Sequence, residues 1–179
     1  MMKFRETSKI YLLNKSTYIN LRWIAYAGQL ITIFLVQFFF KFKFDYISCI
    51  SIVLISILTN LYLKFKIKEN QLNNFTSVIF LVYDILQLTI LFFFTGGITN
   101  PFIFLIIIPA VFSSQYLNIK TSIILVSLTT FVLVFLTFFY HNLPHPEILH
   151  FHAPNYYLYS VPIAILIGLT FLVYFGVKF

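Results

Sequence analysis

The sequence is poor in charged residues and has almost no cysteine. Only 9% of its 179 residues are Asp, Glu, Lys or Arg, whereas 60% are hydrophobic. A soluble domain carries roughly a quarter charged residues, so a surface that faces water on all sides is excluded. The single cysteine, Cys49, excludes an internal disulfide, and its apolar surroundings predict a buried, unreactive thiol.

The sequence also lacks the common motifs of soluble enzymes. It contains no Gly-rich phosphate loop, no G-x-S-x-G motif and no HExxH motif. The net charge of +7 would favour nucleic acid as a partner of a soluble protein. Here the Lys and Arg residues stand at the ends of apolar runs, so they indicate anchoring to lipid, and no nucleic-acid partner is expected.

What the sequence does contain is six long apolar runs. Each approaches the ~20 residues that a helix needs to cross about 30 Å of hydrocarbon. The runs are continuously apolar and lack the strict alternation of barrel strands, so helices are expected. The predicted fold class is an all-α membrane protein, a six-helix transmembrane bundle over residues 24–179 that follows a cytoplasmic segment of residues 1–23. The predicted spans are residues 24–40, 46–63, 76–94, 101–117, 121–140 and 157–177.

Lys and Arg are distributed unevenly between the two sides of such a bundle. Of the twelve Lys and Arg residues, only Lys41 and Lys43 fall on the side opposite the termini. Because cytoplasmic loops are rich in Lys and Arg, both termini are predicted to be cytoplasmic. The turn between the third and fourth spans then faces outward.

The most specific motif is the heptapeptide Gly96-Gly97-Ile98-Thr99-Asn100-Pro101-Phe102. The glycines can end the third helix with positive φ, Asn100 can cap the next helix, and Pro101 suits its first position. A tight turn between antiparallel helices would account for all of these residues. A binding site is the alternative, because Asn100 offers a donor and an acceptor, Phe102 offers a stacking face, and glycines admit a flat ligand to the backbone. A quinone head, a flat ring with two carbonyl acceptors, matches such a site.

Three polar side chains fall within the predicted spans. Asp84 and Gln87 lie three residues apart on one face of the third span, and Gln29 lies in the first. An acid inside the bilayer is costly and usually faces the bundle interior, so Asp84 is expected to pair with Gln29 or Gln87. Adhesion between helices and a proton-linked or signal-transmitting role are both compatible with this placement.

Arg22 and the histidines have simpler interpretations. Arg22 and Trp23 open the first span and are expected to be interfacial anchors, with Arg22 reaching lipid phosphates. The four histidines share one loop before the last span, where a plain interfacial loop, a pH-sensitive loop and a zinc or copper site are alternatives. Their spacing matches no standard metal site, so no metal is predicted. These histidines are His141, His145, His150 and His152.

The heptapeptide resembles the G-G-x-x-N-P-F motif of the RegB/PrrB/ActS family of redox-responsive sensor histidine kinases. All five fixed positions of that motif match. The resemblance continues in the first span with Leu21-Arg22-Trp23-x-Ala25-x-x-Gly28-Gln29. In the third span it continues with Asp84-x-x-Gln87-Leu88.

The resemblance implies the transmembrane sensor domain of a two-component histidine kinase in a bacterial inner membrane. In that family the heptapeptide is associated with ubiquinone binding, and the redox state of the quinone pool controls the kinase. The family also implies a homodimer and a response regulator as partner. The residues that would then form the site for ubiquinone or a related quinone are Gly96, Gly97, Asn100, Pro101 and Phe102.

Residues 1–179 contain no phosphoacceptor box and no ATP-binding motif. We therefore expect no kinase activity from these residues alone, and a fragment, a truncated product and a free-standing sensor module are all compatible with the sequence. A different class of function also fits six spans: a small-molecule-binding membrane subunit of a transporter, with Gln29 and Asp84 in its substrate cavity. Copurification with an energy-coupling ATPase would support that alternative.

Overall fold

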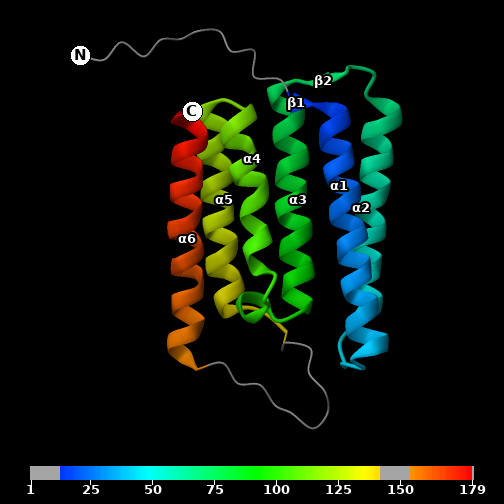
Figure 1. The fold of residues 1–179 in the computed structure, drawn as a ribbon, viewed down its shortest axis with the longest axis vertical. Helices are drawn as coiled ribbons and strands as arrows, with labels where there is room; N and C mark the ends of the chain where they lie inside the picture. Colours follow the sequence, from blue (N-terminus) through cyan, green and yellow to red (C-terminus); the bar gives the residue numbers. More distant parts are fainter. Residues whose placement is uncertain (1–12, 142–153, 179) are drawn as a thin grey trace, which may run out of the picture.

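The computed structural model describes residues 13–141 and 154–178, and these form one bundle of long helices (Figure 1). The predicted six-helix transmembrane fold is confirmed. Five of the helical segments are long and apolar enough to cross a membrane, and the fourth, Ile103–Tyr116, is shorter. The helices are α1 (Lys15–Phe34), α2 (Tyr46–Lys66), α3 (Asn74–Phe94), α4 (Ile108–Tyr116), α5 (Ile119–Phe138) and α6 (Asn155–Lys178).

The first helix begins at Lys15, well before the predicted start of the first span at residue 24. Asn14 caps it, because its side-chain oxygen accepts from the Thr17 amide at 3.1 Å. The two residues before it form β1 (Leu13–Asn14), which pairs antiparallel with β2 (Gln71–Leu72). Polar residues in the first turns conceal this helix from a search for apolar runs. A π-helix, η1 (Leu35–Phe39), continues α1 at its far end.

The segment after the heptapeptide is not the single helix predicted for residues 101–117. Two 3₁₀ turns, η2 (Gly97–Thr99) and η3 (Ile103–Ile107), precede α4. Pro109 stands in the first turn of α4, where its missing N–H costs nothing. In a helix begun at Pro101, the same proline would break a hydrogen bond and clash with the preceding turn. The prediction that Pro101 opens the fourth helix is therefore wrong.

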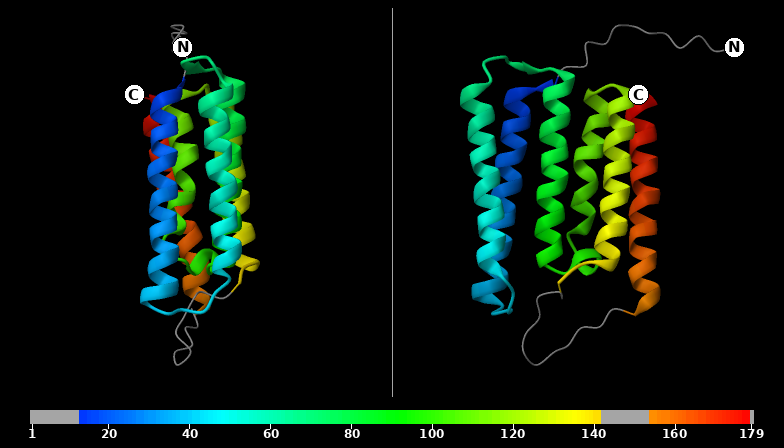
Figure 2. Two further views of the ribbon diagram at one scale, coloured as in Figure 1. Left: turned by 90° about the vertical axis from the view of Figure 1, so that its right-hand side faces the viewer. Right: turned by 180° about the vertical axis from the view of Figure 1, so that it is seen from behind.

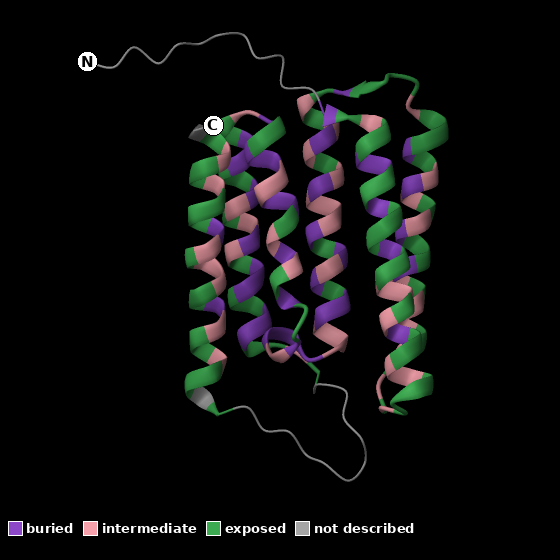
Figure 3. Ribbon diagram, in the orientation of Figure 1, coloured by how far each residue is buried: buried purple, intermediate pink, exposed green. Residues whose placement is uncertain are grey.

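The helices pack as two hydrophobic clusters that share α3. The larger cluster extends through α3, α4, α5 and α6 and reaches the start of α1. The smaller one lies between α1 and α2 and includes the buried Cys49 and Leu91 of α3. Exposed positions run along the outer faces of the helices (Figure 3), as expected for surfaces that contact lipid. The predicted burial of the Cys49 thiol is confirmed.

The start of α1 and the end of α6 lie at the same end of the bundle, together with the end of α2 and the start of α5 (Figures 1 and 2). The lysines near these ends therefore share one side of the molecule, opposite the loop of Lys41 and Lys43. This is the arrangement from which the cytoplasmic side was inferred, and the orientation itself stays a prediction.

Candidate functional site

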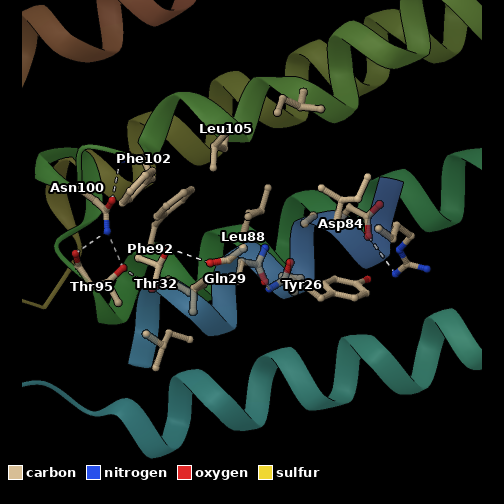
Figure 4. Close-up of a pocket in the computed structure, with 18 of the residues that line it drawn as sticks. Tyr26, Gln29, Thr32, Asp84, Leu88, Phe92, Thr95, Asn100, Phe102 and Leu105 are labelled. Carbon is tan, nitrogen blue, oxygen red and sulfur yellow. Dashed lines mark hydrogen bonds and ion pairs between the residues drawn. The ribbon is translucent and has the colours of Figure 1, made fainter. Parts of the chain in front are cut away.

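The candidate site is a pocket between α1, α3 and the η3–α4 segment, with a volume of about 610 Å³ (Figure 4). Its walls are apolar and include Ile33, Leu88, Phe92 and Leu105. Polar side chains line it at three levels, from the heptapeptide turn to the middle of the bundle. The predicted residues that it brings together are Gln29, Asp84, Gln87, Asn100, Pro101 and Phe102.

Both glycines of the heptapeptide have the positive φ that was predicted, 109° at Gly96 and 53° at Gly97. A Cβ added to Gly97 would lie 2.4 Å from the Cβ of Tyr140 and 2.8 Å from the Leu136 carbonyl oxygen. The end of α5 thus occupies the space beside Gly97. Neither glycine lines the pocket. The two glycines therefore provide the backbone conformation of the turn and make no contact with the pocket.

Asn100 is almost fully engaged within the turn. Its Nδ2 donates to the carbonyl oxygen and to the Oγ1 of Thr95, both at 2.9 Å. Its Oδ1 accepts from the Phe102 amide at 2.8 Å. Since an amide side chain has two N–H donors, none is left for a ligand. Asn100 therefore fixes the turn that presents Phe102, which is 44% exposed, at the end of the pocket.

At the middle level, Nε2 of Gln87 donates to Oε1 of Gln29 at 3.1 Å and joins α3 to α1. The expected partnership of Asp84 with one of these glutamines is wrong. The two glutamines bond each other, and Asp84 has a charged partner instead.

That partner is Arg22, whose Nη2 lies 3.0 Å from Oδ1 of Asp84. The same nitrogen donates to Oγ1 of Thr59 on α2 at 2.8 Å, and the Tyr18 hydroxyl donates to the second carboxylate oxygen. The Arg22 side chain is only 4% exposed, so its interpretation as an interfacial anchor is wrong. Because α1 begins at Lys15, Arg22 lies two turns inside the helix, where only a charged partner makes its burial tolerable.

Four aromatic rings surround the Arg22 guanidinium at 5.4–5.7 Å from its central carbon. Such cation–π contacts stabilise a cation that has lost its hydration. The sequence held a signal that our prediction missed, because Tyr18 and Tyr26 stand four residues before and after Arg22 on one helical face. The rings belong to Tyr18, Tyr26, Phe80 and Tyr83.

Comparison with known proteins identifies the family of the chain. A model of the PilS-like transmembrane domain matches residues 19–179. The chain belongs to this family. It is also 32% identical over 157 residues to the sensor histidine kinase RegB of Cereibacter sphaeroides. No solved structure matches the chain.

The match to RegB covers 87% of this chain but only 34% of that protein, so the chain spans about a third of the relative's length. The resemblance inferred from the heptapeptide is confirmed at the level of the family. Because the family match runs from residue 19 to the last helix, all the residues that line the pocket, except Tyr18, lie within the PilS-like domain.

Of the histidines, only His141 falls among the described residues of the PilS-like domain, and the other three lie outside them. The His141 amide donates to the Phe93 carbonyl at 2.8 Å, and its ring stacks on Phe94 at 5.4 Å between centroids. Residues 13–141 and 154–178 contain no group of three side chains suited to a metal ion.

Proposed function

We propose that the PilS-like domain binds a membrane quinone and reports its redox state to a histidine kinase module. The observation that carries the proposal is the pocket between α1, α3 and the η3–α4 segment, which combines apolar walls with a few polar side chains along its length. Its volume of about 610 Å³ is typical of small-molecule sites. A quinone ring needs such walls, a stacking face and a donor for its carbonyl oxygens.

The rim of the pocket supports a lipid-soluble ligand. Ile24, Phe102 and Ile108 line the pocket and are also exposed on the outer surface of the bundle. In a membrane this surface faces acyl chains, so a ring can enter sideways while its isoprenoid tail stays in lipid. Ubiquinone or a related quinone is the ligand class that we favour.

Signal transmission would follow a shift between two arrangements of the bundle. The oxidised and reduced ligands would bind these arrangements unequally, and the helix that leaves the membrane would carry the difference to the kinase. The route offered by the fold runs from η3 through α4 to α6, because Gly176 of α6 packs directly on Ser114 of α4. The domain would act in a bacterial inner membrane as a homodimer, with both termini cytoplasmic and a response regulator downstream.

The test is quinone binding to the chain in lipid nanodiscs, with a radiolabelled short-chain ubiquinone. We expect saturable binding that Phe102→Ala weakens about two- to tenfold, because one aromatic contact contributes about 0.5–1.5 kcal/mol. Phe131→Ala is the matched control, since Phe131 is 69% exposed on α5 and does not line the pocket. Equal effects of the two substitutions, or the absence of saturable binding, would contradict the proposal.

A further inference from the structure

The Gln29–Gln87 pair uses only part of its hydrogen-bonding capacity. The bond from Gln87 Nε2 to Gln29 Oε1 leaves two N–H donors on Gln29 and the Oε1 acceptor on Gln87. Among the described residues none accepts from Gln29 Nε2 or donates to Gln87 Oε1. Both residues line the pocket, and neither atom is sealed off from open space.

The other polar side chains of the pocket have no comparable donor. The Asn100 donors are both bonded to Thr95. The hydroxyl groups of Thr32 and Thr95 donate to carbonyl oxygens of their own helices, Gly28 and Leu91. The Tyr26 hydroxyl has no hydrogen-bond partner among the described residues, but it is fully buried and therefore out of reach of a ligand in the open pocket. The uncommitted neutral donors that open into the pocket therefore belong to the glutamine pair.

The charged end of the pocket does not supply a donor either. Nε and Nη1 of Arg22 have no hydrogen-bond partner among the described residues, but both atoms are fully buried. They lie among the aromatic rings that surround the guanidinium. A ligand oxygen could reach them only if that packing were disrupted, whereas Gln29 is half-buried and faces the pocket.

We infer that Gln29 is the residue that donates a hydrogen bond to the ring oxygen of the bound quinone, and that Gln87 holds its amide in position. The inference rests on the proposed function and places this bond on α1 instead of the heptapeptide turn. The ring then lies between Gln29 and Phe102, and so links α1 to the residue that directly precedes η3.

The pair also distinguishes the two redox forms by its hydrogen bonds. A quinone carbonyl only accepts, so it engages Gln29 of α1. A quinol hydroxyl accepts and donates, so it engages Gln29 and in addition donates to Oε1 of Gln87 on α3. Reduction of the ligand thus adds a bond to α3 without a change of binding site.

The experiment compares Gln29→Leu with Gln37→Leu in the whole chain in nanodiscs. Gln37 is the matched control, because it lies in the η1 continuation of α1 but does not line the pocket. We expect Gln29→Leu to weaken binding of the short-chain quinone about three- to tenfold, the loss of one neutral hydrogen bond. Gln37→Leu should bind as tightly as the unsubstituted chain.

Infrared difference spectra with a ¹³C-carbonyl-labelled quinone report directly on hydrogen bonds to the carbonyl oxygen. A purely structural role of Gln29 would not change the frequency of this carbonyl band. The unsubstituted chain should shift the bound carbonyl band to lower frequency than in plain lipid, and Gln29→Leu should abolish part of this shift. The inference is overturned if Gln29→Leu keeps full affinity and the full shift. If Gln29→Leu fails to fold, the infrared spectrum of the unsubstituted chain is the test. An unshifted carbonyl band of the quinone bound to that chain also overturns the inference.

The two proposals fail separately. Saturable binding that is insensitive to Gln29 leaves the quinone function intact and removes only Gln29 as the donor. No saturable binding to the unsubstituted chain removes both.

Discussion

At the scale of single residues, the charged pair of Arg22 and Asp84 has a large expected effect on stability. Sequence reasoning placed Asp84 inside the bundle, because an acid in an apolar span has to face other protein. It placed Arg22 at the interface, because the first apolar run begins at residue 24, and an arginine beside a tryptophan at the start of a span is typical of an interfacial anchor. To predict the partner of an intramembrane charge from one sequence, one must know how far inside its helix each charged residue lies. For Arg22 this depth depends on where α1 begins, which the sequence did not reveal.

Asp84→Asn should destabilise the bundle strongly. It leaves the buried Arg22 guanidinium without a counter-charge, and breaking such a pair costs about 3–5 kcal/mol. Unfolding in detergent, followed by circular dichroism, should show the loss. Replacing both charges, Arg22→Leu with Asp84→Leu, should recover most of it. A single substitution as stable as the parent chain would show that the pair is not formed.

Gly97→Ala tests the turn at the same scale. Its positive φ of 53° and its contacts with Tyr140 and Leu136 leave no room for a methyl group, so we expect poor folding and loss of the bundle. Gly28→Ala is the control, because nothing lies within 4 Å of an added Cβ there. Expression and thermal stability should fall for Gly97→Ala and not for Gly28→Ala. A Gly97→Ala variant as stable as the parent chain would contradict the described turn.

At the scale of elements, the helices with clear ends were predictable and the fourth was not. α2, α3 and α5 begin after Asp45, Asn73 and Asn118, whose side chains accept from the backbone three residues later. These caps, followed by apolar runs, fix the helix starts locally. The 3₁₀ form of η3 depends on Pro109 and on packing against other helices. Neither influence can be recognised in the sequence, because this segment is a continuous apolar run that is compatible with a single helix.

Contact between α4 and α6 makes a prediction for Gly176. A methyl group there would lie 2.2 Å from Ser114 Oγ, so Gly176→Ala should destabilise the domain by about 1–3 kcal/mol. The matched control on the same helix is Gly168→Ala, where nothing lies within 4 Å. Thermal unfolding of the two variants decides the matter, and equal midpoints would contradict close packing of these helices at that point.

At the scale of the whole molecule, six spans with both ends on one side followed from composition and the Lys and Arg count. The pocket did not follow, although Gln29, Asp84 and Phe102 were each singled out. Apolar runs establish which segments are helices, but not which helices are neighbours or where they diverge. The pocket lies between α1, α3 and the η3–α4 segment, and this arrangement is a property of the assembled bundle.

The predicted orientation can be measured by cysteine labelling in a Cys49→Ser background. Lys41→Cys should react with a membrane-impermeant thiol reagent added outside intact cells. Lys68→Cys should react only after the cells are permeabilised, because its loop shares the side of the termini. The reverse pattern would invert the orientation and would move the heptapeptide turn to the cytoplasm.

The rim formed by Ile24, Phe102 and Ile108 has a consequence for how tightly the site must bind. A ligand that enters from the acyl chains equilibrates with its concentration in the bilayer, which for a quinone far exceeds its concentration in water. A site of modest intrinsic affinity is then filled in proportion to the mole fraction of ligand in lipid. Diluting the vesicles with buffer would leave its occupancy unchanged, whereas adding empty lipid would lower it.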